Sequence, residues 1–97
     1  RIRRTATWQR SLDDRILEHL RDDSWSTPRH MAKLAGIHAT EAQVRERCYM
    51  LADAELVTFL TKDADFVGIT TPGKQYLDGE IDMELHPKPR HPESITN

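Results

Sequence analysis

The sequence is poor in cysteine: Cys48 is the only one among 97 residues. A single cysteine excludes an internal disulfide and a zinc site built from several cysteine ligands. It also agrees with a reducing compartment, because structural disulfides are rare in the cytosol. We therefore expect a cytoplasmic protein in which Cys48 is a small buried hydrophobic residue.

Long apolar runs are missing as well. No uninterrupted stretch approaches the roughly 20 apolar residues that a membrane-spanning helix needs, and no signal peptide is visible. The chain begins at Arg1 rather than Met, which is compatible with a missing N-terminal piece. A chain of 97 residues has room for one domain with one modest core. No association with a membrane is expected.

Motifs of catalysis are absent too. The chain contains no glycine-rich phosphate-binding loop and no nucleophile motif. Its five histidines have no neighbouring acid at a spacing typical of a metal site; they are His19, His30, His38, His86 and His91. The sequence therefore predicts no enzyme, no metal and no cofactor, and a core this small leaves no evident pocket for a small-molecule ligand.

Positive charge is in short supply, since 14 Lys and Arg residues are set against 16 Asp and Glu residues for a net charge of −2. DNA-binding domains are usually basic, so this sum does not favour a nucleic acid partner. The distribution is less unfavourable. Residues 1–10 hold four arginines and no acid, and cations outnumber acids between residues 29 and 50. A basic segment on an acidic body is compatible with DNA binding at one face.

The most informative stretch, residues 27–56, is typical of two helices joined by a tight turn. Thr27-Pro28 is an N-cap followed by proline at the first helical position. Gly36 stands where a helix would end in a left-handed conformation, and Thr40 with Gln43 has the spacing of a capping box. Two helices joined by about three or four residues form a helix-turn-helix, whose second helix can lie in the DNA major groove.

An earlier helix is predicted over about residues 7–22, because apolar residues recur there every four positions. These residues are Trp8, Leu12, Ile16 and Leu20, with Leu17 widening the stripe. The acids of this helix lie off the stripe and are expected to face water; they are Asp13, Asp14, Glu18 and Asp22. Residues 1–6 lack apolar periodicity and are expected to form a flexible basic arm.

The core-facing residues of the next two helices follow from the same spacing. Trp25 is expected to fill the core beneath the second helix, whose inward residues are Met31, Leu34 and Ala35. The third helix, over about residues 40–54, buries Val44, Cys48 and Leu51. A rotation of 100° per residue then places Met50 away from the core and Arg47 at its edge.

After Glu55 the pattern changes from helical to extended. Residues 56–60 and 66–70 are rich in β-branched and aromatic side chains and flank a polar connector of hairpin length. Gly68 in the second strand indicates a bulge or a close backbone approach. A hairpin directly after the third helix is the wing of a winged-helix domain.

The C-terminal part is expected to be less regular. Thr71-Pro72 begins a short helix that faces Tyr76 and Leu77 inward and stops at Gly79. Residues 81–85 either pack back weakly or pair with a second copy, and the proline- and histidine-containing residues 86–97 are expected to form a mobile tail. The predicted fold is mainly α with a small β-hairpin (α+β): a winged helix-turn-helix over residues 7–85, with three helices, a two-stranded wing and a short C-terminal helix.

Four segments resemble a known family: DDRILEHL, TPRHMAKLAGI, VRERCYMLADAELV and ITTPGKQYLDGEID. Over about residues 13–82 the chain resembles the haloarchaeal winged-helix regulators related to the phage phi-H repressor. The resemblance implies an archaeal, repressor-like regulator of transcription that binds double-stranded DNA as a homodimer. Two features depart from the family pattern. Glu55 stands where such helices usually end in glycine, and the wing carries Asp63 and Asp65 beside Lys62.

Side chains near the start of the third helix are the candidates for contact with base edges. They are Thr40, Gln43, Arg45 and Glu46. Arginine can read guanine bidentately and glutamine can read adenine in the same way. Gln43 has a rival role as the capping partner of Thr40, and Arg45 has one as the ion-pair partner of Glu41, four residues earlier.

Three further cations are candidate phosphate contacts, which position a protein on DNA without reading its sequence. They are Arg29, Arg47 and the wing residue Lys62. A homodimer would use the first helix with Trp8, or residues 76–85, as its seam. The rival interpretation is a winged-helix protein–protein interaction module. A basic patch around the four candidate cations would favour DNA, whereas carboxylates crowding that face would favour a protein partner.

Overall fold

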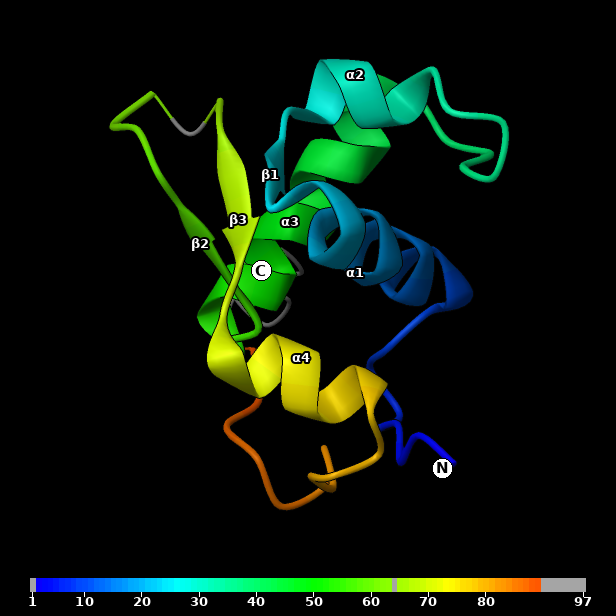
Figure 1. The fold of residues 1–97 in the computed structure, drawn as a ribbon, viewed down its shortest axis with the longest axis vertical. Helices are drawn as coiled ribbons and strands as arrows, with labels where there is room; N and C mark the ends of the chain where they lie inside the picture. The colour runs from blue at the N-terminus through cyan, green and yellow to red at the C-terminus, as the bar shows by residue number, and fades with distance from the viewer. Residues whose placement is uncertain (1, 64, 90–97) are drawn as a thin grey trace, which may run out of the picture.

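The computed structural model describes residues 2–63 and 65–89, in which four helices and three short strands are arranged as a small layered domain (Figure 1). In chain order the elements are α1 (Ser11–Asp23), β1 (Trp25–Ser26), α2 (Pro28–Ala32), α3 (Glu41–Asp53), β2 (Val57–Phe59), β3 (Val67–Ile69) and α4 (Thr71–Leu77). None of the helices in this part of the chain has the length and apolar content that a membrane crossing requires.

The strands form one antiparallel sheet in the order β1–β3–β2. β2 and β3 are the two arms of the predicted wing, with Thr58 opposite Gly68. β1 is a third strand that the sequence did not predict, and it places Trp25 on the other side of Gly68. The α+β class and the hairpin after the third helix are therefore confirmed, with a sheet one strand wider than expected.

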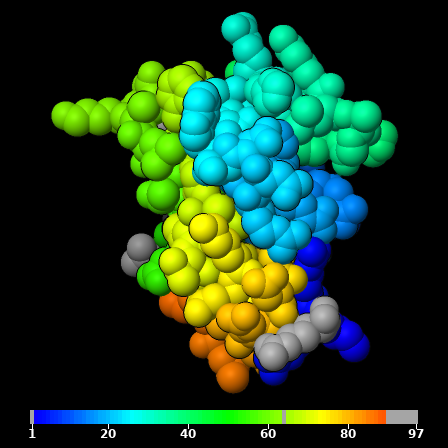
Figure 2. Space-filling model, viewed as in Figure 1, coloured from blue at the N-terminus to red at the C-terminus, as the bar shows by residue number. Residues whose placement is uncertain are grey.

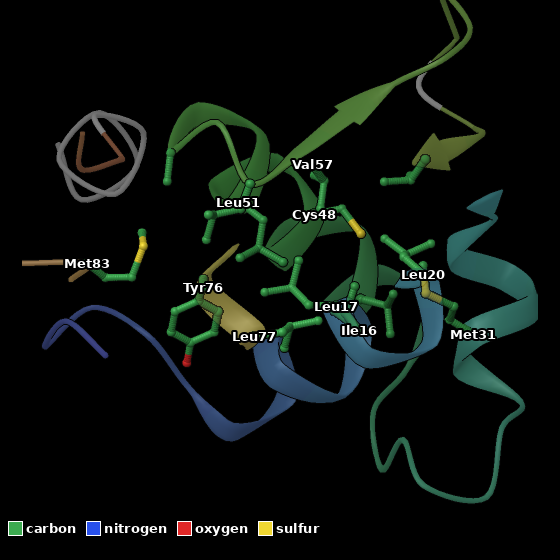
Figure 3. Packing of buried hydrophobic residues seen from close by; sticks show 14 of the residues in the cluster. Ile16, Leu17, Leu20, Met31, Cys48, Leu51, Val57, Tyr76, Leu77 and Met83 are labelled. Atoms are coloured by element: carbon green, nitrogen blue, oxygen red, sulfur yellow. The ribbon is translucent and has the colours of Figure 1, made fainter. Parts of the chain in front are cut away.

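The core lies between α1, α3, α4 and the inner side of the sheet (Figure 3). Its fully buried side chains include Ile16, Leu17, Leu20, Met31, Val44, Cys48, Leu51, Val67 and Tyr76. Spacings of three and four residues bring these side chains to one face of each helix, which confirms the apolar faces predicted for α1 and α3. Burial raises the pKa of the Cys48 thiol to about 12, so this residue is a neutral core side chain, as predicted.

Two charged residues lie within the core, although Asp13 was expected to face water and Arg47 to lie at the edge of the core. Asp13 is fully buried, and its two carboxylate oxygens accept hydrogen bonds from Nε and Nη2 of Arg47 at 2.8 and 2.7 Å. Arg47 itself is only 6% exposed. Met50, expected to face away, is also buried, with its sulfur 3.0 Å from Arg47 Nη1. The prediction was wrong because each helix was considered alone, whereas each charge is neutralised by the opposite helix.

The connection between α2 and α3 differs most from the prediction. α2 ends at Ala32, so residues 33–40 form the connection, which is longer than the predicted three or four residues. Gly36 is not left-handed: among the described residues, positive φ occurs only at Ser24, Glu55 and Gly79. Ala35 is exposed, contrary to prediction, because the helix has already ended. Ile37 from the connection is buried in the core instead.

Trp25 does not fill the core and is 53% exposed. Successive side chains of a strand point to opposite faces. In β1 it is Ser26 that is buried, which leaves Trp25 on the outer face of the sheet. Its ring packs edge-on against Phe66, the residue just before β3, with the ring centroids 5.2 Å apart.

The start of the chain differs from the expected flexible arm. Arg3 donates to Glu18 at 2.6 Å and to the Leu77 carbonyl at 3.0 Å, which ties the N-terminal segment to α1 and the end of α4. The backbone N–H of Met83 donates to the Arg4 carbonyl at 3.0 Å, and the Met83 side chain is fully buried. Of the two alternatives for residues 81–85, the structure shows that they pack back on their own chain. Most of the predicted tail, residues 90–97, lies outside the described residues.

The helix signals of α3 and α4 are confirmed. Both helices end in the same motif, in which the residue after the C-cap takes a positive φ. That residue is Gly79 after α4, with φ 75°, and Glu55 after α3, with φ 68°. After α3 the backbone N–H groups of Glu55 and Leu56 both donate 2.9 Å hydrogen bonds, to the carbonyls of Ala52 and Leu51. Glu55 therefore occupies a position that favours glycine.

Candidate nucleic-acid interface

α3 packs against α2, α1 and the strand β2. The wing and α2 project from the same end of the molecule, while α4 lies at the opposite end (Figure 1). In the space-filling view, side chains of the α2 region and of the wing tip protrude from this end (Figure 2). The outer face of α3, α2 and the wing are thus parts of one surface, which we call the α3–wing surface.

At the start of α3, Thr40 and Gln43 cap the helix. Thr40 Oγ1 accepts from the Gln43 N–H at 3.2 Å, and Gln43 Oε1 accepts from the Thr40 N–H at 2.9 Å. Bidentate reading of adenine needs both the oxygen and the nitrogen of a glutamine amide. Because its oxygen is occupied by the backbone, Gln43 could read adenine in this way only after releasing the cap.

Arg45 lies between α3 and the wing, where two carboxylates share one nitrogen of its guanidinium. Nη2 is 3.3 Å from Glu41 Oε2 and 3.6 Å from Asp65 Oδ1. The ion pair with Glu41 is the one that the sequence spacing offered. The contact with Asp65 was not predicted, because it depends on how the wing folds back over α3. The Arg45 side chain remains 29% exposed.

The three predicted phosphate contacts have different surroundings. The Arg29 side chain is 76% exposed at the start of α2, with its Nε 4.0 Å from Glu41 Oε1. Lys62 is exposed in the wing. Arg47 is buried against Asp13 and cannot reach a phosphate without leaving the core. The basic patch expected around these residues therefore lacks Arg47.

The wing tip is ordered by a local turn. Asp63 Oδ1 accepts from the Thr61 hydroxyl at 2.6 Å and from the Asp65 N–H at 3.2 Å. These two hydrogen bonds hold the pKa of the exposed Asp63 carboxyl below its ordinary value. The turn fixes Asp65 near Arg45 and leaves Lys62 beside two acids.

Other exposed residues of this surface were not among the candidates. His30 and Lys33 are exposed beside Arg29 on and after α2. Tyr49 is 41% exposed on α3, next to the exposed Glu46, and its ring lies 5.0 Å from that of Phe59. The helical rotation already placed Tyr49 outside, so its position was available from the sequence.

The charge of the α3–wing surface is mixed. On α3 the exposed acids Glu41 and Glu46 accompany Arg45, and on the wing Asp63 and Asp65 accompany Lys62. Positive charge is concentrated instead at α2. Within residues 2–63 and 65–89, no three His, Cys, Asp or Glu side chains are grouped so as to hold a metal ion.

Comparison with known proteins gives one solved structure to which the chain is similar. It is the crystal structure of the PhiH1 repressor-like protein from Haloarcula marismortui, with a TM-score of 0.84 and 28% sequence identity. The similarity covers 91% of this chain and 98% of that protein. No protein-family model and no curated protein sequence matches the chain. The match over nearly the whole of both chains confirms the winged-helix fold and the resemblance to haloarchaeal regulators related to the phage phi-H repressor.

Proposed function

We propose that the protein is a cytoplasmic, repressor-like regulator of transcription that binds double-stranded DNA in a sequence-specific manner. The observation that carries this proposal is the similarity to a repressor-like protein over 91% of the chain. The placement of α2, α3 and the wing at one end of the molecule supports it, because a winged-helix protein uses these elements together. In the proposed complex, α3 enters the major groove and the wing lies along the flanking backbone.

The side chains divide into two roles in this complex. Arg45 and Glu46 face base edges, where arginine reads guanine and glutamate accepts from the amino group of cytosine. Arg29 and Lys62 contact phosphates, and we add Lys33 because it is exposed beside Arg29. Thr40 and Gln43 act through the helix cap. Arg47 is left out because it is buried.

A homodimer is part of the proposal, since two-fold symmetry would match palindromic half-sites about one helical turn apart. Of the two seams predicted from the sequence, we favour the C-terminal segment together with the N-terminal segment around Arg4 that it contacts. Ile2 and Leu85 are 87% and 86% exposed there, whereas Trp8 is partly buried. Light scattering tests the dimer: replacing Leu85 by aspartate should lower the apparent mass if the segment forms the seam.

DNA binding is tested by fluorescence anisotropy with labelled duplexes, first selected from a random pool because the operator is unknown. We expect the wild type to bind, and Arg45→Ala to weaken binding to selected duplexes by about 5- to 150-fold, the loss of about 1–3 kcal/mol that one bidentate base contact contributes. Arg21→Ala is the matched control, because Arg21 also pairs with a carboxylate, Asp78 at 3.4 Å, but lies on α1. Equal losses in both variants would contradict a reading role for Arg45.

The protein–protein interaction module remains a second candidate, and a specific observation favours it. Carboxylates accompany the cations along the α3–wing surface, with Glu41 and Asp65 both contacting Arg45. A folded wild-type protein that binds no duplex, even at low salt where phosphate contacts are strongest, would refute the DNA proposal and leave the interaction module as the better candidate.

A further inference from the structure

The contact between the wing and α3 through Arg45 has a consequence for any binding of DNA. Glu41 and Asp65 approach the same nitrogen of Arg45, at 3.3 and 3.6 Å. Two carboxylates around one guanidinium leave a local charge of −1 rather than +1. We call Glu41, Arg45 and Asp65 together the arginine clamp.

The clamp is tied to the elements around it. Glu41 is also 4.0 Å from Arg29 of α2, so its carboxylate is shared between two arginines. Asp65 is held by the wing turn, in which its own backbone N–H donates to Asp63 at 3.2 Å. The neighbouring Phe66 packs against Trp25 of β1. Asp65 is therefore held at its own backbone N–H and flanked by a residue that packs against β1.

We propose that Asp65 is a positioning residue for Arg45 that also competes with DNA for its guanidinium. In the free protein it holds Arg45 between α3 and the wing. On binding, a phosphate or a base edge has to replace the carboxylate, so part of the favourable electrostatic interaction is spent on separating the ion pair. This inference rests on the proposed function, because it concerns the same surface and the same ligand.

Competition of this kind is measurable through the effect of salt. The logarithm of DNA affinity falls with the logarithm of salt concentration with a slope of about −0.9 per phosphate contact. Removing the Asp65 charge makes the DNA-facing surface more positive by one charge, which we count as about one such contact. The same relation predicts that a protein without the Asp65 charge binds DNA about eightfold more tightly than the wild type at 0.1 M salt, and that this gain disappears near 1 M salt.

Asp65→Asn is the variant of choice, because it removes the charge and keeps the size of the side chain. Glu41 is less suitable, since an acid in the first turn of a helix also stabilises the helix itself. We expect Asp65→Asn to bind a mixed-sequence duplex about eightfold more tightly at 0.1 M salt, with a log–log slope steeper by about 0.9. Asp65→Glu restores the carboxylate and should return both values toward the wild type.

Two further variants distinguish competition at Arg45 from a general effect of removing a negative charge. Asp78→Asn removes the same charge from a similar pair, Arg21–Asp78 at 3.4 Å, away from the α3–wing surface. It should leave the slope unchanged. Arg45→Gln combined with Asp65→Asn should lose the gain, because the released group is then absent.

The outcomes distinguish this inference from the proposed function. If the wild type binds DNA and Asp65→Asn binds with the same affinity and slope, the competition is refuted while the function stands. An equal gain in Asp78→Asn, or a gain that survives in the double variant, would also refute it. If neither the wild type nor Asp65→Asn binds any duplex at low salt, although circular dichroism shows both folded, the proposed function fails and the inference fails with it.

Discussion

Buried between α1 and α3, the guanidinium of Arg47 is surrounded by hydrogen-bond acceptors. Besides the two oxygens of Asp13, the Trp8 carbonyl accepts from Nη2 at 3.1 Å. Asp13 in turn accepts from the backbone N–H of Arg10 at 3.0 Å, near the positive end of the α1 dipole. Such a pair is a poor source of net stability, but removing one partner leaves the other charge buried and unpaired.

Arg47→Ala should therefore be strongly destabilising. We expect a loss of about 3–5 kcal/mol in the free energy of unfolding, because Asp13 would remain in the core without its partner. Arg45→Ala breaks exposed pairs on the same helix and should cost less than about 1 kcal/mol. Urea denaturation followed by circular dichroism measures both values. Similar losses in the two variants would show that Asp13 reaches water when its partner is removed.

Cys48 gives a prediction that depends on pH. Desolvation, followed by the nearby charge of Asp13, raises the pKa of its thiol from 9.0 to about 12. An unfolded chain would release this proton near the ordinary value, so the folded state binds more protons between these two values. The contribution of Cys48 to stability is thus complete below pH 9 and is lost as the pH rises toward 12.

Two measurements test this behaviour of Cys48. A thiol reagent at about pH 8 should react with the protein only after unfolding, since the thiolate is the reactive form and the folded thiol is buried. Unfolding free energies measured between pH 9 and 12 should fall less steeply in Cys48→Ala than in the wild type. Rapid labelling of the native protein would contradict the burial of this side chain.

Among the helices and strands, those with strong local signals could be predicted from the sequence. The capping box of Thr40 and Gln43 fixed the start of α3, and the two β-branched runs identified the wing. β1 could not be found in this way, because a two-residue strand has no periodicity and exists only through pairing with β3. Gly36 was misjudged because α2 already ends at Ala32, where the sequence carries no glycine or other stop signal.

For the candidate site too, features set by local sequence signals could be predicted, whereas features set by tertiary contacts could not. The outward-facing positions of α3, the partly exposed Arg45 and the exposed Glu46, follow from helical rotation. Arg47 could have been assigned to the core from the sequence, since positions 44, 47, 48 and 51 follow one apolar stripe, as do 13, 16, 17 and 20 on α1. Opposite charges at stripe positions of two helices are a signal for a buried pair. The contact of Asp65 with Arg45 depends on tertiary structure alone.

The end of α3 gives a prediction for a single element. A left-handed conformation costs a residue other than glycine about 1–2 kcal/mol, and Glu55 adopts it with φ 68°. Glu55→Gly should remove this strain. Part of the gain is lost because glycine gives the unfolded chain more conformational entropy. We therefore expect a net rise of about 0.5–1 kcal/mol in the free energy of unfolding. Thermal or urea denaturation is the measurement.

Glu55→Ala is the matched control for this change. It removes the carboxylate but keeps the Cβ atom, so the backbone strain remains and no gain is expected. Should Glu55→Ala stabilise the protein as much as Glu55→Gly, the gain would come from lost charge repulsion and the strain account would be wrong.

For the molecule as a whole, both ends of the described chain are part of the domain. The segment around Arg4 pairs with the segment around Asp82, and Met83 from this region is fully buried in the core (Figure 3). Tyr76 connects the same region to α1, because its hydroxyl donates to Asp14 at 2.6 Å. Residues near the two ends of the described chain therefore contact one another, and the segment after the wing is part of the folded domain.

Met83→Ala tests whether this closure contributes to global stability. Truncating a buried methionine leaves a cavity, and we expect a loss of about 2–5 kcal/mol in the unfolding free energy. Lys74→Ala, on α4, alters an exposed side chain outside the proposed dimer seam and should change stability by less than about 0.5 kcal/mol. If each variant unfolds in a single transition and only Met83→Ala is destabilised, the C-terminal segment and the core unfold as one cooperative unit. An unchanged midpoint in Met83→Ala would mean that the segment detaches before the core unfolds.

The cap at the start of α3 limits how this helix could acquire a new target sequence. Thr40 and Gln43 are committed to each other's backbone, so a substitution at either position alters the stability of the helix together with its contacts. Variation without that penalty is confined to exposed positions outside the cap pair, such as 42 and 46. A library randomised only at those positions would keep its members folded, and divergence between descendants of this protein should accumulate there while the cap pair stays constant.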